Sequence, residues 1–167
     1  MIEELNSILP NIPNLLNNNW DTLLINKYPP IIHRLSLKLS DTRTLLLHKL
    51  FNTKDQKALM HSHSWKFACK VLQGSYEMGV GYSEDRDKPP NSIFTSFVNS
   101  GDIYEILSPN IWHYTKPAKD CEFSYSIMLI GERVRERKAE NNSSLSNKDK
   151  QDVLDWFSRF KYENNKS

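Results

Sequence analysis

The segment that begins at His61 alternates strictly between apolar and polar residues, and this alternation most constrains the fold of the chain. Successive side chains of a β-strand point to opposite faces, so a period of two predicts a strand with one buried face. One face carries His61, His63, Trp65, Phe67, Cys69 and Val71, and the other carries Ser62, Ser64, Lys66, Ala68 and Lys70. We therefore expect a sheet whose interior receives two histidines.

The two histidines on this apolar face indicate a metal site. An imidazole is costly to bury unless its nitrogens find partners, and a metal ion is one such partner. His113 lies on a later expected strand and would complete three nitrogen donors. Three ligands leave coordination positions open, as catalytic metal sites do. Hydrogen-bonded core or surface histidines are the alternative interpretation of the same pattern.

Short strands account for most of the middle of the chain. Leu35, Leu37 and Leu39 share one face of an alternating segment, and residues 43–51 are a denser apolar run typical of a strand buried on both sides. Turn-forming residues separate further expected strands at residues 59–73, 75–82, 92–98, 102–107, 111–116 and 122–131. So many short strands in 167 residues predict a single all-β sandwich or barrel over residues 31–131.

The N-terminal segment, residues 1–30, has helical signals. Apolar residues near the start are spaced along one helical face, and two prolines then interrupt the pattern. Asn19 is a suitable N-cap for a second stretch of helix, which Pro29-Pro30 would end. We expect helices here that precede the β domain.

The C-terminal end also favours a helix. Residues 132–145 are charged and then rich in Asn and Ser, which predicts a polar loop. Within residues 146–167, Ser146 and Asp149 fit a capping box, and apolar residues follow at helical spacing. We expect this helix to pack on the barrel, with a helix that binds a partner as the alternative.

Composition excludes several classes of function. The formal net charge is +2 and no basic run carries interleaved aromatics, so neither a nucleic acid nor an anionic membrane surface is an expected partner. No apolar stretch is long enough to span a bilayer. Glu3 and Glu4 stand where a secretory signal would carry positive charge. With Cys69 and Cys121 as its two cysteines, the chain is expected in the cytoplasm.

Two stretches resemble the conserved motifs of the cupin superfamily, a small jelly-roll β-barrel. The first, His61–Gly74, reads HSHSWKFACKVLQG, and the second, Gly101–His113, reads GDIYEILSPNIWH. The His-x-His pair, both glycines, Pro109 and the last histidine follow the superfamily's order. The glutamate of the first motif is missing, since Phe67 and Ala68 occupy its expected places, and so is the glycine that follows the proline.

The absent glutamate is chemically informative. Three neutral histidines leave a metal with its full positive charge, which favours anionic ligands such as thiolates and carboxylates. Within the superfamily this set resembles the thiol dioxygenases, such as cysteine dioxygenase. That resemblance implies Fe(II) held by His61, His63 and His113, with Zn, Mn or Ni as other suitable metals. It also implies an O₂-dependent oxidation of a small anionic or thiol-containing substrate.

The resemblance to thiol dioxygenases implies one further candidate for substrate binding, whereas the family's catalytic His and Tyr have no counterpart in this chain. That family binds the substrate carboxylate with an upstream arginine, a part that Arg34 would take here. Arg34 shares its strand face with Ser36 and Lys38, so an outward orientation is an equal expectation. Met128 and Ile130 stand where the family has a catalytic His and Tyr, and neither can transfer protons.

Other residues are candidates by their position on the expected strands. Tyr76 would orient a substrate through its hydroxyl if its face is the interior one, and it is otherwise a core residue. Glu77 and Glu105 are candidates for a fourth metal ligand, with a salt bridge to a lysine or arginine as the alternative. His33 and His48 lack paired spacing and are expected to be structural.

Two other functions stay open at this point. One is a metal-dependent isomerase or lyase of cupin type, in which the metal acts as a Lewis acid. The other is a non-catalytic cupin that binds a small ligand. In each case the expected partner is a small molecule. A homodimer paired through sheet edges is a further expectation.

Overall fold

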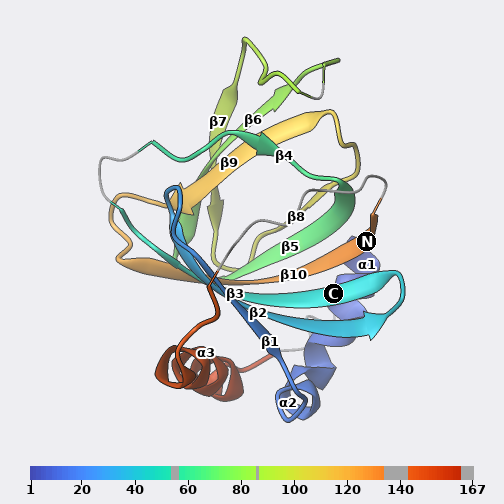
Figure 1. Cartoon of the computed structure of the whole chain (residues 1–167), viewed down its shortest axis with the longest axis vertical. Coiled ribbons are helices and arrows are strands. Elements are labelled where there is room, and N and C mark those ends of the chain that lie inside the picture. Colours follow the sequence, from blue (N-terminus) through green and yellow to red (C-terminus); the bar gives the residue numbers. More distant parts are fainter. Residues whose placement is uncertain (54–56, 86, 134–142, 163–167) are drawn as a thin grey trace.

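Two antiparallel sheets face each other in the computed structural model (Figure 1), which describes residues 1–53, 57–85, 87–133 and 143–162. Within these ranges the six-stranded sheet has the order β1 (Asp21–Ile25), β2 (Ile31–Ser40), β3 (Arg43–Phe51), β10 (Phe123–Arg133), β5 (Trp65–Gln73) and β8 (Ile103–Ile106). The four-stranded sheet has the order β4 (His61–Ser62), β9 (Ile111–Pro117), β6 (Ser75–Tyr82) and β7 (Phe94–Asn99). The predicted all-β core is confirmed.

The segment with the two histidines forms two strands rather than the single one predicted over residues 59–73. β4 belongs to the four-stranded sheet and β5 to the six-stranded sheet, so the chain crosses between the sheets at His63 and Ser64. One straight strand cannot pair in both sheets, and the interruption allows the crossing. The alternation nevertheless holds, because Phe67, Cys69 and Val71 are buried between the sheets.

The N-terminal helices end earlier than predicted. α1 (Ile2–Ile8), a 3-10 turn (Leu9–Asn11) and α2 (Ile12–Leu15) form, but the helix expected from Asn19 does not, because β1 occupies its place and pairs with β2. The Leu24 side chain packs in the hydrophobic core between the six-stranded sheet and the helices. Leu23 and Ile25 line a cavity on the opposite face of this sheet. A short apolar run of this kind is compatible with the period of a helix and with that of a strand, and pairing with β2 makes it a strand.

The C-terminal helix α3 (Asn147–Arg159) begins as predicted. The Ser146 hydroxyl oxygen accepts a hydrogen bond from the Asp149 amide at 3.1 Å, which is the expected N-cap. The helix ends well before residue 167, and residues 163–167 lie outside the described part of the chain. Of the predicted polar loop, residues 134–142 also lie outside it, and residues 132 and 133 continue β10.

The six-stranded sheet separates two hydrophobic cores. The outer core joins its outer face to α1, α2 and α3, and it contains Leu35, Leu45, Leu47, Ala68, Ile127, Leu129, Val153 and Phe157. The inner core lies between the sheets and contains Leu46, Leu50, Phe67, Cys69, Val71, Tyr76, Met78, Val98, Ile106 and Met128.

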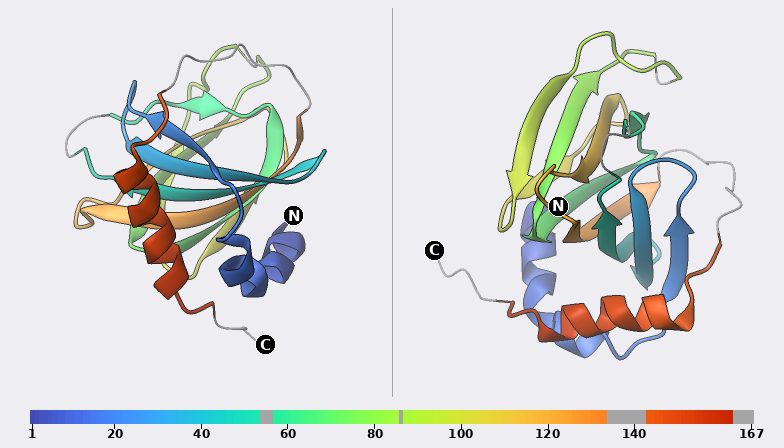
Figure 2. Two further views of the ribbon diagram at one scale, coloured as in Figure 1. Left: turned by 60° about the horizontal axis from the view of Figure 1, so that its bottom comes forward. Right: turned by 90° about the vertical axis from the view of Figure 1, so that its left-hand side faces the viewer.

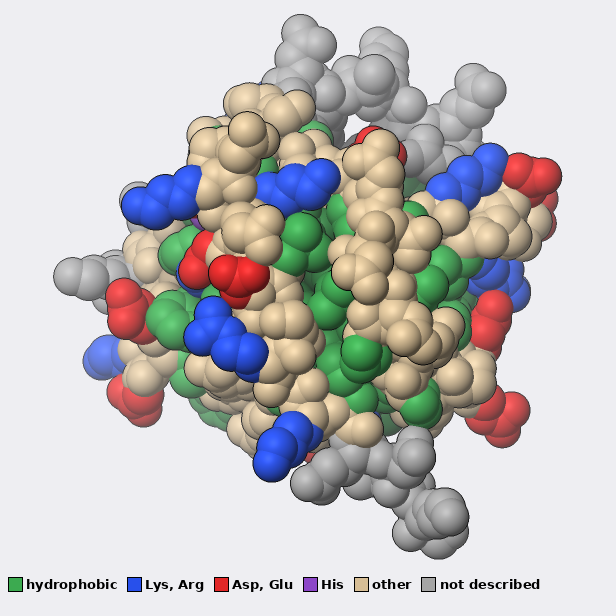
Figure 3. Space-filling model, turned by 90° about the horizontal axis from the view of Figure 1, so that it is seen from below, with side chains coloured by type: hydrophobic (Ala, Val, Ile, Leu, Met, Phe, Trp, Pro, Cys, Tyr) green, Lys and Arg blue, Asp and Glu red, His purple; other side chains and the backbone are tan. Residues whose placement is uncertain are grey.

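The helices lie across the outer face of the six-stranded sheet (Figure 2). Seen from that side, hydrophobic side chains are exposed among acidic and basic side chains (Figure 3). Leu35 and Leu37 of β2 pack in the outer core, so the opposite face of β2 points between the sheets. Among the described helices none is long and apolar enough to cross a membrane.

Candidate metal centre

Three histidines converge where the chain crosses between the sheets. His61 lies directly opposite His113 in the register of β4 against β9, and His63 follows two residues later on the same side. Their ligand nitrogens all lie within 4.8 Å of one another, and the two Nε2 atoms of His63 and His113 are 2.8 Å apart. The structure thus brings the three predicted metal ligands together.

The nitrogen positions fit a divalent transition metal. Two imidazole nitrogens at about 2.1 Å from one ion and at right angles are roughly 3 Å apart, close to the spacing of His63 and His113. The Nδ1 of His61 lies 2.9 Å from the Leu59 carbonyl oxygen, a contact that places its proton on Nδ1 and its lone pair on Nε2. The buried Nδ1 of His113 has no hydrogen-bond partner among the described residues.

The surroundings keep His113 neutral. His113 is buried, and burial, followed by the proximity of His61, holds its pKa well below the usual value for histidine. The Phe67 ring packs against His63 and His113, with centroids 4.9 and 5.5 Å away, and Trp65 packs against His63 at 5.3 Å. Neutral imidazole is the form that binds metals, so burial favours ligation.

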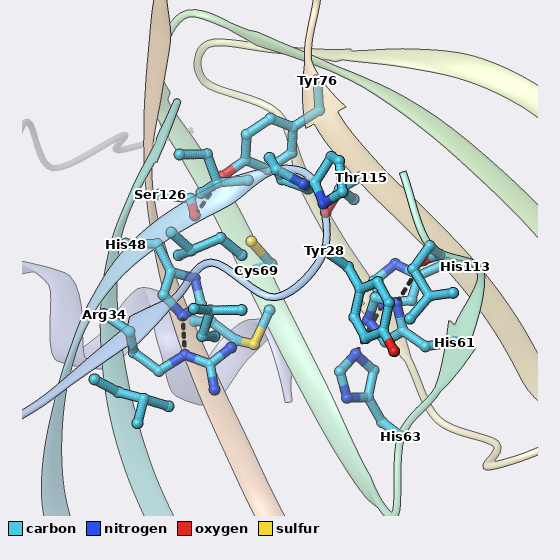
Figure 4. A pocket seen from close by; sticks show the side chains of 18 of the residues that line it. Tyr28, Arg34, His48, His61, His63, Cys69, Tyr76, His113, Thr115 and Ser126 are labelled. Atoms are coloured by element: carbon cyan, nitrogen blue, oxygen red, sulfur yellow. Dashed lines mark hydrogen bonds between the residues drawn. The ribbon is translucent and has the colours of Figure 1, made fainter. Parts of the chain in front are cut away.

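The histidines form one side of a cavity of about 430 Å³ between the sheets (Figure 4). Arg34 and His48 lie on the other side of it, and Tyr28 lies beside the histidines. Arg34 therefore points inward, which resolves the two expected orientations. Among the described residues that line the cavity, none is an aspartate or glutamate.

Arg34 is held by His48, a histidine whose spacing predicts a structural role. The two residues are cross-strand partners on β2 and β3, and the Nε–H of Arg34 donates to Nε2 of His48 at 2.9 Å. Burial and the neighbouring guanidinium hold the pKa of His48 well below its usual value. A neutral His48 can accept this bond and so orients the guanidinium. The spacing of residues along one strand does not show which residue lies opposite on the neighbouring strand. The sequence therefore does not predict that His48 contacts Arg34.

A second group of polar side chains lines the cavity deeper inside. Tyr76 belongs to the inner core, as the core alternative expects, and it also lines the cavity, where its hydroxyl donates to the Ser126 hydroxyl at 2.6 Å. Tyr104 and Ser126 interact with the Cys69 thiol, whose pKa is raised by burial to about 11. Ser126 is also the cross-strand partner of His48. A polar row thus crosses the inner face from Arg34 to Ser126.

The two candidate carboxylate ligands lie elsewhere. Glu77 binds the Lys116 ammonium at 3.1 Å, and Glu105 binds the N-terminal ammonium at 3.4 Å. Neither lines the cavity or belongs to the histidine cluster. The salt-bridge alternative is therefore correct for Glu77, whereas Glu105 pairs with the N-terminal ammonium in place of the expected lysine or arginine. Met128 lines the cavity and Ile130 packs against the inner core, so neither supplies a proton-transfer group there.

Comparisons with known proteins establish the fold. No family model matches the sequence, and no curated protein matches it. Hydroxypropylphosphonic acid epoxidase from S. wedmorenis is similar in structure, with a TM-score of 0.53, 16% identity, and 67% of this chain and 55% of the epoxidase covered. An Fe(II) structure of HppE gives a TM-score of 0.53, 15% identity, and coverage of 68% and 57%. A single-residue variant of oxalate decarboxylase from Bacillus subtilis matches at a TM-score of 0.49 and 13% identity, over 70% of this chain and 28% of that chain.

The chain spans just over half the length of the first of these proteins. At these identities the similarity concerns the arrangement of the strands. The two facing antiparallel sheets, with the histidine cluster between β4 and β9, have the architecture that the two sequence motifs predict. The chain therefore folds as a cupin-type jelly roll with helices added at both ends.

Proposed function

We propose that this protein is a mononuclear Fe(II) dioxygenase that oxidises a small thiol-containing carboxylate. One observation supports this most: the histidine cluster and Arg34 share a single cavity whose described lining contains no carboxylate. Three neutral nitrogens leave a divalent ion uncompensated, and the guanidinium adds a further positive charge. Opposite charges attract more strongly where apolar surroundings lower the local dielectric constant, so the cavity favours an anionic substrate.

The chain's own residues account for substrate placement. Arg34, oriented by His48, would bind the substrate carboxylate through its fork of N–H donors. Tyr76 and Ser126 would hold polar atoms between the two ends, while Phe67 and Trp65 keep the histidine side apolar and exclude water. An Fe(II) ion held by the three histidines would supply a centre that reacts with O₂ and binds a thiolate.

The proposed reaction is balanced without a further reductant. A thiol R–SH and O₂ give the sulfinic acid R–SO₂H, so both oxygen atoms end on sulfur and sulfur supplies all the electrons that O₂ accepts. The described cavity holds neutral His48, Tyr76 and Ser126 but no carboxylate base. The substrate is therefore expected to enter already as the thiolate, which the positive charge of the site stabilises.

Oxygen consumption by metal-reconstituted protein tests this proposal. Protein loaded anaerobically with Fe(II) is mixed with cysteine, 3-mercaptopropionate or mercaptoacetate in an oxygen electrode, and the product is identified by mass spectrometry. We expect O₂ uptake and a sulfinate with at least one of these thiols, and neither with Zn(II)-loaded protein. Arg34→Gln should raise KM more than it lowers kcat.

Other results would redirect the assignment. Turnover of an added compound without O₂, equal for Zn(II) and Fe(II), would identify an isomerase or lyase instead. Fe(II)-loaded protein that binds these thiols without consuming O₂ would identify a ligand-binding cupin. Either outcome contradicts the dioxygenase.

A further inference from the structure

The hairpin of β1 and β2 forms one wall of the cavity, between Arg34 and the histidine cluster. The Arg34 side chain lies across the cavity from the three histidines, whereas Tyr28, in the loop between the two strands, lies beside them (Figure 4). β2 starts at Ile31, and a strand rises about 3.3 Å per residue, so Arg34 lies roughly 10 Å along the strand from that start. The hairpin therefore leads from the guanidinium towards the histidines.

This wall is apolar and only partly covered by the protein. Apart from Arg34, the hairpin residues that line the cavity are all aliphatic or aromatic: Leu23, Ile25, Tyr28, Pro29, Pro30 and Ile32. In the register of the two strands Ile25 lies opposite Ile32, and Leu23 lies opposite Arg34. Leu23, Ile25 and Ile32 are half-buried, and Tyr28 is 49% exposed. The wall thus keeps apolar surface that an apolar part of a ligand can cover, and covering it is favourable.

The guanidinium of Arg34 is held away from the histidine cluster. Its Nε–H donates to Nε2 of His48 at 2.9 Å, and His48 lies on the neighbouring strand β3, so the guanidinium stays near the inner face of the six-stranded sheet. His61 and His113 belong to the four-stranded sheet, and facing sheets lie about 10 Å apart. A ligand that contacts both ends must therefore cross between the sheets and also follow the hairpin.

The cavity is also larger than a short thiol requires. Its volume of about 430 Å³ falls within the range of roughly 300–1,000 Å³ that is typical of pockets for drug-sized ligands. In mercaptoacetate a single methylene separates the sulfur from the carboxylate. Such a molecule would occupy one end of the cavity and leave most of the apolar wall uncovered.

We propose that the substrate is an ω-thiol carboxylate in which an apolar chain of medium length separates the sulfur from the carboxylate. The carboxylate binds Arg34, the chain lies along Ile25 and Ile32, and the thiol end reaches the histidine cluster beside Tyr28. This inference deepens the proposed function and rests on it for the identity of the reacting group, the thiol. The position of the carboxylate and the apolar nature of the chain rest on the cavity wall alone.

Isothermal titration calorimetry without O₂ tests the dependence of binding on chain length. Zn(II)-loaded protein is titrated with mercaptoacetate, 3-mercaptopropionate, 6-mercaptohexanoate and 8-mercaptooctanoate. Each methylene buried on the wall should raise the affinity roughly threefold to fourfold, so we expect the Kd of the best long thiol to lie at least about tenfold below that of mercaptoacetate. Butanoate, hexanoate and octanoate are titrated into metal-free protein to measure the chain without thiol or metal, and their affinities should rise in the same order.

Variants of the wall locate the chain within the cavity. Ile25→Asn places an amide in the middle of the wall and should weaken binding of 8-mercaptooctanoate and of octanoate by at least about fivefold. Ile32→Ala shortens the same part of the wall and is read if the first variant does not fold by circular dichroism. Leu39→Asn, at an exposed position on β2 outside the cavity, is the matched control and should bind both ligands as the wild type does.

Two outcomes of the titrations would overturn this proposal. Equal affinities of the wild type for the long and the short ligands would show that the wall does not hold an apolar chain. Folded wall variants that keep the affinity of the wild type for the long ligands would place the chain elsewhere.

The titrations also separate this proposal from the dioxygenase. Long thiols that bind with the expected dependence on length but consume no O₂ with Fe(II)-loaded protein would contradict the dioxygenase and support the extended substrate. Oxidation of short thiols at a KM no higher than that of the long ones would support the dioxygenase and contradict the extended substrate.

Discussion

The two faces of the six-stranded sheet are built from the same strands but serve different purposes. The outer face is apolar and packs beneath the helices, with Leu35, Leu47 and Leu129 fully buried. The inner face carries the polar row from Arg34 through His48 to Ser126. Period two makes this division possible, because neighbours in sequence point in opposite directions.

Leu47 and His48 show the division within one dipeptide. Leu47 packs in the outer core, while His48 accepts the hydrogen bond that orients Arg34 in the cavity. The outer face is expected to determine stability, and the inner face is expected to determine what the protein binds. Matched substitutions on the two faces can separate these effects.

The largest expected effect on stability comes from Leu47→Ala. Its side chain is fully buried, so truncation loses apolar burial and leaves a cavity, with an expected loss of about 2–5 kcal/mol in the free energy of unfolding. Urea denaturation measures this loss. Metal binding in the absence of denaturant should be unchanged. Impaired metal binding by the folded variant would show that the outer face is not independent of the site.

The second effect is a pH dependence that arises from His48. Its pKa is lowered in the native state by burial and by Arg34, so below about pH 6.5 the unfolded chain binds a proton that the native protein does not. Stability is therefore lost as the pH falls, by roughly 1–2 kcal/mol for this group between about pH 6.5 and pH 5.

Two variants of His48 separate titration from hydrogen bonding. His48→Gln keeps an acceptor for Arg34, whereas His48→Leu removes it, and both should lose this part of the pH dependence in urea denaturation. His33 and His113, whose pKa values are also lowered, contribute equally to each protein and cancel. KM for an active thiol should rise in the leucine variant and much less in the glutamine variant. An unchanged pH slope in both variants would contradict a neutral, buried His48.

The smallest expected effect concerns the helix that covers the outer face. Ser146→Ala removes the N-cap of α3 and should cost about 1 kcal/mol in the free energy of unfolding. Thermal unfolding followed by circular dichroism detects this change, and Ser146→Asp is the matched control because it restores a capping oxygen. O₂ uptake by the Fe(II)-loaded variant should equal that of the wild type. A lower rate would tie the helical layer to the cavity.

Much of the fold and of the metal site could be predicted from local patterns. The extents of β3 and β6 match the predicted strands, because turn-forming residues bound these segments. The alternation from His61 placed His61 and His63 on the inward face, and the spacing of the two motifs added His113. These signals are local in sequence or follow from motif order, so one chain suffices to detect them.

The remaining features depend on contacts between distant segments. The leucines of β2 indicated a buried face correctly, but that face belongs to the outer core, so the polar face with Arg34 borders the cavity. A sheet with a core on each side does not follow the rule that its polar face meets water. The partnership of Arg34 with His48 and the conversion of the segment after Asn19 into β1 arise from strand pairing, which periodicity does not encode.

The metal content of the protein tests the central claim most directly. Tag-free protein is reconstituted anaerobically with Fe(II), desalted and measured by mass spectrometry of metals, alongside His113→Ala and, as a matched control at another largely buried histidine, His33→Ala. We predict about one equivalent in the wild type and in His33→Ala, and loss of the metal from His113→Ala with an unchanged circular dichroism spectrum. Less than about a tenth of an equivalent in the wild type, or equal metal in His113→Ala, would contradict the three-histidine centre.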